Sequence, residues 1–177
     1  VPRLNTGRRP LPFMLAAILR RIARLFPPSG FGVEEKEQAP RPVRVVLDTN
    51  VLIAAAWNAG SASRRIVEAC LEGETLRAVS SPALRREYEF ILKRAARKSK
   101  YHKELERFIE EAEEVECDAK EMGIEVPDDP DDAKVLATAV AGEADALLGN
   151  DHHLLDLADT ATVPILRPGA FLREWDL

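Results

Sequence analysis

Short apolar runs alternate with longer helical segments along most of this chain. The β-branched run Val43–Leu47 and the run Leu76–Val79 have the length and composition of buried strands. Ala146–Leu148 and Val163–Leu166 repeat the pattern towards the C-terminus, and residues 124–126 predict one more short strand. Strands that alternate with helices form a parallel sheet with helices on both faces. We therefore expect a three-layer α/β domain.

Capping residues and glycines mark the ends of the helices between these strands. Ser63 is placed to cap one helix, which Gly73 ends, and Ser81 with Pro82 begins another. The expected helices are 51–56, 63–72, 82–96, 102–115, 131–142, 152–158 and 169–176. A chain of 177 residues accommodates one domain of this kind and an extension.

The first 42 residues differ from residues 43–177 in composition and in the pattern of apolar positions. Residues 12–26 have apolar side chains at helical spacing and arginines off that stripe, which predicts an amphipathic helix. Residues 27–42 are rich in Pro, Gly and charge, as linkers are. We expect an N-terminal extension, 1–42, and one domain, 43–177. Three roles stay open for the helix: weak docking of a largely unstructured segment, binding to a partner protein, and attachment to a membrane surface.

Charge is spread unevenly over the chain, whose net charge is −5. Eight basic and three acidic residues give 1–42 a net charge of +5, which leaves −10 on the remainder. Such a domain repels nucleic acid unless its acids are clustered and neutralised by cations. Cys70 and Cys117 form no CxxC pair, and the apolar run 11–19 is followed by arginines and not by a cleavage site. We expect a cytoplasmic protein without integral membrane segments.

Acidic residues gather where the predicted strands end. Asp48 follows the first strand directly, and Asp151 comes soon after the fourth. Glu87 lies in the helix after the second strand, and Asp132 lies in the first turn of the helix before the fourth. The carboxyl ends of parallel strands meet at one edge of the sheet, where ligands bind. We therefore expect these four carboxylates to lie near one another.

Four close carboxylates repel one another unless a cation lies between them. Oxygen ligands without thiolates suit Mg²⁺ or Mn²⁺, and such ions catalyse phosphodiester hydrolysis. Two alternatives stay open: Asp129 or Asp131 can replace Asp132 as the ligand, and ordinary capping or solvent exposure can explain each acid separately. The pair His152 and His153 is not expected to form a metal site, because adjacent residues of a helix face different directions.

Three segments of the chain resemble the acidic motifs of the PIN domain family. They are VVLDTNVLIAA, SSPALRREYEFILKR and DPDDAKVLATAVAGEADALLGNDHHLL, and the similarity extends over residues 43–175. The resemblance implies a PIN-like fold with strand order 3-2-1-4-5, cleavage of single-stranded RNA, and Mg²⁺ or Mn²⁺ as cofactor. It is closest to the PIN proteins that are toxins of toxin–antitoxin pairs. This implies an antitoxin protein as partner and a homodimer.

The resemblance assigns roles to individual residues. Four match the metal-binding acids of the family: Asp48, Glu87, Asp132 and Asp151. Asn50 matches the polar residue that steadies the first acid or the attacking water, and completes the catalytic set. Gly149 departs from the pattern, since the family commonly has Thr or Ser there. The missing hydroxyl leaves a catalytically weak PIN scaffold that binds RNA or a protein as the alternative function. A phosphohydrolase of the haloacid dehalogenase type fits less well, because it requires Asp at position 50.

A run of basic residues without acids occupies 93–103. It predicts a track for RNA phosphates that leads to the acidic centre, although a solvated helix face also explains it. The candidate RNA-binding residues are Lys93, Arg94, Arg97, Lys98 and Lys100.

Overall fold

A computed structural model describes residues 41–126 and 130–177, so the helix expected at 12–26 lies outside the described residues. The described chain forms one five-stranded sheet in which every neighbouring pair is parallel. Its strands are β1 Val43–Leu47, β2 Leu76–Ser80, β3 Glu113–Glu114, β4 Ala146–Leu148 and β5 Ile165–Leu166. Their order is β3-β2-β1-β4-β5, which confirms the α/β class and the expected 3-2-1-4-5 arrangement.

Helices fill the intervals as expected. They are α2 Thr49–Trp57, α3 Ala62–Glu72, α4 Pro82–Ile91, α5 His102–Glu111, α6 Ala133–Ala141, α7 His152–Asp156 and α8 Pro168–Trp175. A π-helical turn, Leu92–Ala96, continues α4, and a 3₁₀ turn, Pro130–Asp132, precedes α6. The cap of α3 differs from the prediction, because the hydroxyl of Ser61 accepts from the Arg64 amide while Ser63 is buried inside the helix.

The third strand is not where the sequence predicts it. Residues 124–126 pair with no strand, since the Ile124 amide donates to the Ala119 carbonyl and closes a turn through Gly123. Glu113 and Glu114 pair with β2 instead, so the helix expected to reach residue 115 ends at Glu111. Glutamates have low strand propensity. These two are held by ion pairs from Arg44 and Arg85, at 2.9 and 3.0 Å.

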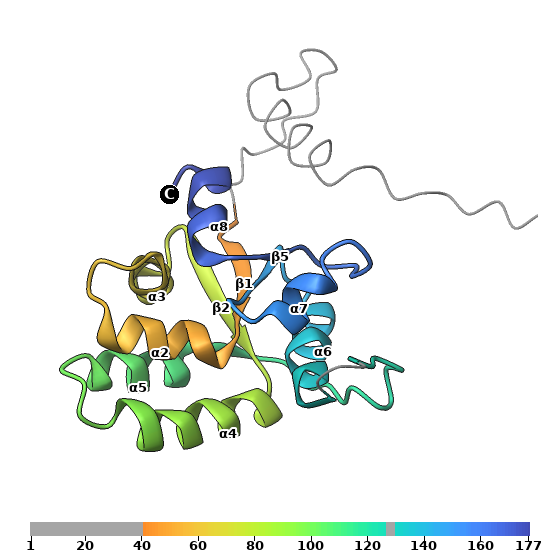
Figure 1. Cartoon of the computed structure of the whole chain (residues 1–177), viewed down its shortest axis with the longest axis horizontal. Helices are drawn as coiled ribbons and strands as arrows, with labels where there is room; N and C mark the ends of the chain where they lie inside the picture. The colour runs from red at the N-terminus through yellow and green to blue at the C-terminus, as the bar shows by residue number, and fades with distance from the viewer. Residues whose placement is uncertain (1–40, 127–129) are drawn as a thin grey trace, which may run out of the picture. The chain divides into compact units, whose positions relative to one another are not determined.

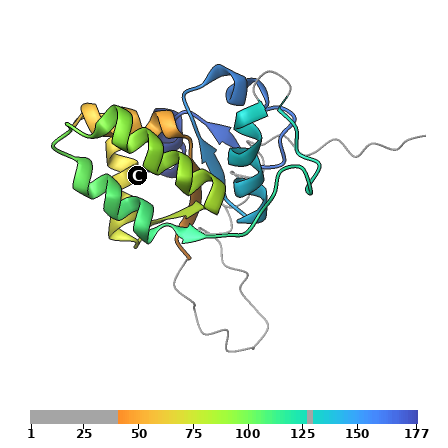
Figure 2. The same ribbon diagram turned by 90° about the horizontal axis from the view of Figure 1, so that it is seen from below.

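The sheet lies between two groups of helices. Figure 1 shows α2, α3, α4 and α5 on one side of it and α6 on the other, and Figure 2 shows the same division from below. Both faces of the sheet are covered, and the side chains of Val45, Val46, Leu147 and Leu148 are fully buried. Among the described residues, no helix has the length and apolar character needed to cross a bilayer.

The central strands bring two loops side by side at their carboxyl ends. Leu47 of β1 is in register with Leu148 of β4, and the Asp48 amide donates to the Leu148 carbonyl at 2.8 Å. The segment that begins with Asp48 therefore lies beside the segment that begins with Gly149. This edge of the sheet is where all four predicted acids are expected.

Candidate metal centre

Asp48 is the most deeply buried of the predicted acids, with 4% of its surface exposed. It is the N-cap of α2, and its Oδ1 accepts from the Thr49 amide at 2.7 Å. Burial is the main cause that raises the pKa of this carboxyl to about 6, the charges of Glu87 and Asp151 contribute to the same rise, and the hydrogen bonds from Thr49 oppose it. The site thus holds a carboxylate whose charge is costly without a cation.

Asn50 connects the two loops at the sheet edge. Its side-chain amide donates to Oδ2 of Asp48, and its Oδ1 accepts from the Asn150 amide at 3.1 Å. Both oxygens of Asp48 are therefore held by neighbours within two residues along the chain. This geometry suits the predicted role of Asn50, which is to orient the first acid.

Glu87 extends from α4 towards the N-terminus of α2. Its Oε1 accepts from the hydroxyl of Thr49 at 3.2 Å, and its Oε2 lies 2.8 Å from Nζ of Lys134 on α6. The Glu87 side chain is 26% exposed. Sequence reasoning missed Lys134, although it lies two residues after Asp132, because a single lysine in an acidic helix start carries no pattern that distinguishes it from a solvated residue.

Lys134 is a built-in cation among these acids. Burial alone would lower the pKa of its ammonium group, but the hydrogen bond to Glu87 and the charges of Glu87, Asp131 and Asp132 raise it. Asp131 lies 4.0 Å from the ammonium and its side chain is 95% exposed, whereas Asp132 is half-buried at the start of α6. The more enclosed Asp132 is therefore the better candidate ligand of the two.

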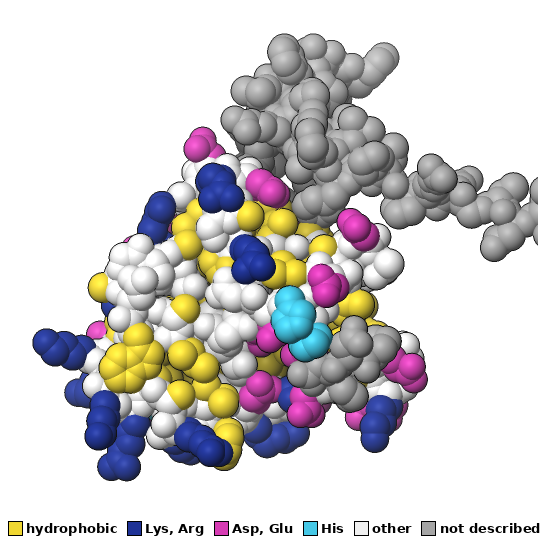
Figure 3. All heavy atoms as spheres, viewed as in Figure 1, with side chains coloured by type: hydrophobic (Ala, Val, Ile, Leu, Met, Phe, Trp, Pro, Cys, Tyr) yellow, Lys and Arg dark blue, Asp and Glu magenta, His cyan; other side chains and the backbone are white. Residues whose placement is uncertain are grey.

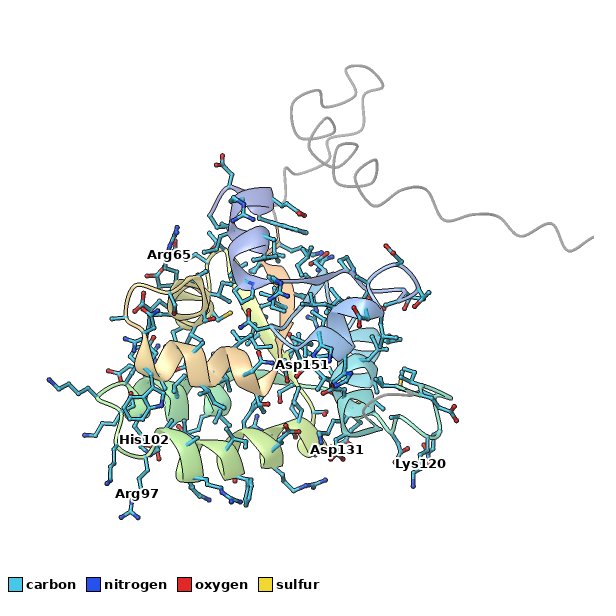
Figure 4. All side chains as sticks on the ribbon, in the orientation of Figure 1. Arg65, Arg97, His102, Lys120, Asp131 and Asp151 are labelled. Atoms are coloured by element: carbon cyan, nitrogen blue, oxygen red, sulfur yellow. The ribbon has the colours of Figure 1, made fainter. Side chains whose placement is uncertain are left out.

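Asp151 is the N-cap of the short helix α7, and its Oδ1 accepts from the His153 amide at 2.9 Å. Figure 4 shows Asp151 and Asp131 on the same side of the domain, near the ends of α7, α6 and α4. The negative charge of Asp151 contributes to the raised pKa of Asp48, which indicates that the two carboxylates act on one another. The fourth acid thus belongs to the same electrostatic group as the first.

The four acids do not form a tight ligand set in the described chain. Among the described residues, the group whose ligand atoms all lie within 4.8 Å of one another is Asp151, His152 and His153. The hydroxyl of Thr49 contacts both Asp48 and Glu87, and the ammonium of Lys134 pairs with Glu87. The expectation that the adjacent histidines face apart is wrong, because their ring centroids are 3.9 Å apart.

The donors fit a hard divalent cation. Asp48, Glu87, Asp132 and Asp151 supply carboxylate oxygens only, which are the ligands that Mg²⁺ and Mn²⁺ prefer. The raised pKa of Asp48 is the observation that favours a cation, since a positive charge there relieves the repulsion from its neighbours. The ammonium of Lys134 already neutralises part of the negative charge of the acids, since it pairs with Glu87.

Gly149 leaves room for a Cβ beside Asp48. A Cβ at this position would meet Cβ of Asp48 and Cδ1 of Leu154, each at 3.5 Å, which is ordinary van der Waals contact. The backbone there therefore does not require glycine. The hydroxyl that the family pattern has at this position is absent, but a side chain could be accommodated.

The basic run lies at the far end of α4 and beyond it. All five predicted RNA-binding side chains are exposed, and Arg94 lies over the exposed ring of Phe90, 5.7 Å from its centroid. None of the five forms an ion pair with a carboxylate in the described part of the chain. Figure 4 shows Arg97 pointing outwards at the opposite end of the domain from Lys120.

This chain is a parallel α/β protein with acids at the carboxyl ends of its central strands, the edge at which such folds bind their ligands. The PIN domain family matches residues 44–153, and the chain belongs to this family. Curated proteins include no match to the sequence. A solved structure with similar architecture is that of VapBC2 from Rickettsia felis, bound to a DNA fragment from its promoter. It is 14% identical, with a TM-score of 0.47 over 71% of this chain and 98% of that chain.

Proposed function

We propose that this protein is a Mg²⁺- or Mn²⁺-dependent endoribonuclease that cleaves single-stranded RNA. The observation that carries the proposal is the buried carboxylate of Asp48, whose pKa is raised to about 6 within a group of further acids. The charge of a carboxylate in such surroundings destabilises the folded state unless a cation lies beside it. Membership of the PIN domain family supports the same function.

The residues of the site have separate roles in this proposal. Asp48, Glu87, Asp132 and Asp151 hold the cation, which when bound supplies Lewis-acid catalysis of phosphodiester hydrolysis. Asn50 orients Asp48 through its amide and is fixed by Asn150. Thr49 joins Asp48 to Glu87 through its hydroxyl. Lys134 neutralises Glu87 until the cation binds.

The exposed cations of 93–103 serve in this proposal as the RNA track. Their charge is unpaired within the described residues, whereas Arg44, Arg85 and Arg107 are each engaged by glutamates. The track is Lys93, Arg94, Arg97, Lys98 and Lys100. The positive charge of this segment offsets the acidic body and brings phosphates towards the centre.

Metal-dependent cleavage is tested with purified protein and labelled single-stranded RNA, in Mn²⁺, in Mg²⁺ and in EDTA. Cleavage should require the metal and be lost in Asp48→Asn and Glu87→Gln. Glu89→Gln is the matched control, since Glu89 is exposed on the same helix and should be dispensable. Equal cleavage in EDTA, or in both Asp48→Asn and the wild type, would contradict the proposal.

The alternative function is a PIN scaffold with weak catalysis that binds RNA or a protein. The ion pair between Lys134 and Glu87 and the missing hydroxyl at Gly149 favour it. This alternative predicts RNA binding with no metal-dependent product over prolonged incubation. The same assay therefore separates the two functions.

The resemblance to toxin-type PIN domains extends the proposal to assembly and role. We propose a cytoplasmic toxin that is neutralised by an antitoxin protein and that forms a homodimer. Light scattering of the purified chain checks the dimer, since a mass near 19.6 kDa over micromolar concentrations would contradict it. Growth arrest on expression, relieved by a protein encoded beside it, would support the toxin role.

A further inference from the structure

The imidazoles of His152 and His153 lie beside the carboxylate of Asp151, and the proposed nuclease chemistry uses neither imidazole. One ligand atom from each of Asp151, His152 and His153 lies within 4.8 Å of the others. Figure 3 shows histidine side chains exposed beside α7, with acidic side chains around them. The third histidine of the chain, His102, is instead engaged by Glu106 on α5 at 3.3 Å.

Two contacts hold this group in place. Oδ1 of Asp151 accepts from the His153 amide at 2.9 Å, and Nδ1 of His152 lies 3.5 Å from the same oxygen. The imidazole rings are tilted by 38°, with centroids 3.9 Å apart. Both histidines are at the beginning of α7, where the chain leaves the extended conformation of Asp151. The rings therefore converge, although residues one position apart in a helix normally diverge.

The spacing is close to what one ion requires. Metal–imidazole bonds of about 2.1 Å allow two donor atoms on one ion to be separated by at most about 4.2 Å. The present separations of up to 4.8 Å need only small side-chain rotations to close. Such rotations meet little resistance, because the His152 side chain is 71% exposed.

We propose that Asp151, His152 and His153 form a second cation site at the rim of the acidic centre. It takes a transition-metal ion such as Co²⁺ or Zn²⁺ and discriminates against Mg²⁺. Imidazole nitrogen is a good ligand for zinc and the other late first-row transition metals, whereas Mg²⁺ binds oxygen ligands and retains several water molecules. The site shares Asp151 with the proposed nuclease centre but does not depend on nuclease activity.

Cobalt(II) is the probe for this site, because its visible absorption bands report the ligands around it. The full chain, without a histidine tag, is titrated with Co²⁺ alone, and Mg²⁺ is then added in excess. Bands that develop with one equivalent of Co²⁺ and persist in Mg²⁺ are expected. His152→Gln and His153→Gln should each weaken Co²⁺ binding at least about tenfold. His102→Gln is the matched control and should leave the titration unchanged.

Asp48→Asn separates this site from the nuclease centre. It should abolish RNA cleavage and leave the cobalt bands in place, whereas the double variant His152→Gln/His153→Gln should lose the bands. An identical cobalt titration for the double variant and the wild type would overturn the proposal, because the ion would then bind only to the acids. Complete displacement of Co²⁺ by equimolar Mg²⁺ would overturn it too. Failure of RNA cleavage in the wild type would affect the proposed function alone.

Discussion

Asp48 shows how one residue couples structure to chemistry at this site. Its side chain caps α2, is oriented by Asn50 and is almost fully buried, so hydrogen bonds to both oxygens and close packing determine its position. The same burial makes its charge unfavourable and raises its pKa to about 6. The cost is present whenever the carboxylate is ionised without a cation. The ionised form of Asp48, which a metal ion needs, therefore lowers the stability of the metal-free protein.

Asp48→Asn should change how stability depends on pH in EDTA. A raised pKa means that the folded state binds more protons than the unfolded state between the ordinary value of 3.8 and about 6. The free energy of unfolding of the wild type should therefore fall by up to about 3 kcal/mol as the pH rises through this range. The variant has no carboxyl at position 48 and should not show this decrease.

Urea unfolding at about pH 4 and about pH 7 measures this difference. The free energy of unfolding of Asp48→Asn minus that of the wild type should be larger at the higher pH. Asp145→Asn is the control, since that carboxylate precedes β4 at the amino end of the strand and pairs with Arg41. A difference that is equal at both pH values would show that Asp48 is not destabilised by burial.

Gly149→Ser should raise the rate of RNA cleavage. A Cβ there makes ordinary contacts and lies 3.7 Å from Oδ2 of Asp48, so a hydroxyl attached to it can reach that oxygen. One additional hydrogen bond of roughly 1 kcal/mol corresponds to an increase of about fivefold. Gly149→Ala adds the Cβ without the hydroxyl and should leave the rate near that of the wild type. Equal rates for the two variants would show that the hydroxyl has no role here.

At the scale of elements, the site is assembled by contacts between α4 and α6. The hydroxyl of Ser81, which caps α4, lies 2.8 Å from that of Thr138 on α6, and both are buried. One turn from Thr138, Lys134 reaches Glu87 on α4. These two contacts bring the second and third acidic motifs together. The hydroxyl of Tyr88 on α4 also donates to the carbonyl of Leu47, which links α4 to β1.

Lys134→Met should make the domain depend more on a divalent cation. Without the ammonium, Glu87 and its neighbours repel one another, and the metal-free protein should lose about 1 kcal/mol of stability. The increase in melting temperature on adding Mn²⁺ should be larger than in the wild type, because Lys134 no longer competes for Glu87. Lys120→Met is the control on an exposed lysine. An unchanged Mn²⁺ effect would mean that Lys134 and the cation do not share this position.

At the scale of the whole molecule, charge is segregated between an acidic centre and a basic segment. The acids occupy the carboxyl edge of the sheet, whereas the exposed cations of 93–103 follow α4 and its π-helical turn. Figure 1 shows that α4 runs from beside α6 towards the opposite side of the domain. RNA that contacts both regions would therefore extend along this helix.

Charge reversal at Lys98 and Lys100 should weaken RNA binding without changing metal affinity. Loss of two phosphate contacts should reduce the slope of log affinity against log salt by about 1.4 for a single strand. Fluorescence anisotropy with a labelled oligonucleotide at several salt concentrations measures this slope. Lys120→Glu, at the opposite end of the domain, should leave it unchanged. Identical slopes for the double variant and the wild type would identify 93–103 as a solvated helix face.

Deletion of residues 1–42 should leave the domain folded and active, as the proposed boundary requires. Strand β1 begins at Val43, and the contact of Arg41 with Asp145 is made by a side chain that is 66% exposed. Circular dichroism, the melting temperature and RNA cleavage of the truncated chain should therefore match those of the full chain. Aggregation or loss of cleavage would place the extension in the core.

Local sequence patterns determined most of the secondary structure and the position of the acids. Apolar runs identified four of the five strands, and the capping signals at Ser81 and Gly73 gave two helix ends correctly. Strand alternation was sufficient to place Asp48 and Asp151 at one edge. These features depend on the alternation of side chains and on backbone geometry, which neighbouring residues control.

Only the tertiary structure decided the features that depend on distant residues. Strand β3 forms from two glutamates because Arg44 and Arg85 approach them from other elements. Lys134 becomes part of the site because α6 packs beside α4. In each case a contact between elements outweighs the local preference, and neither propensity nor periodicity contains that contact.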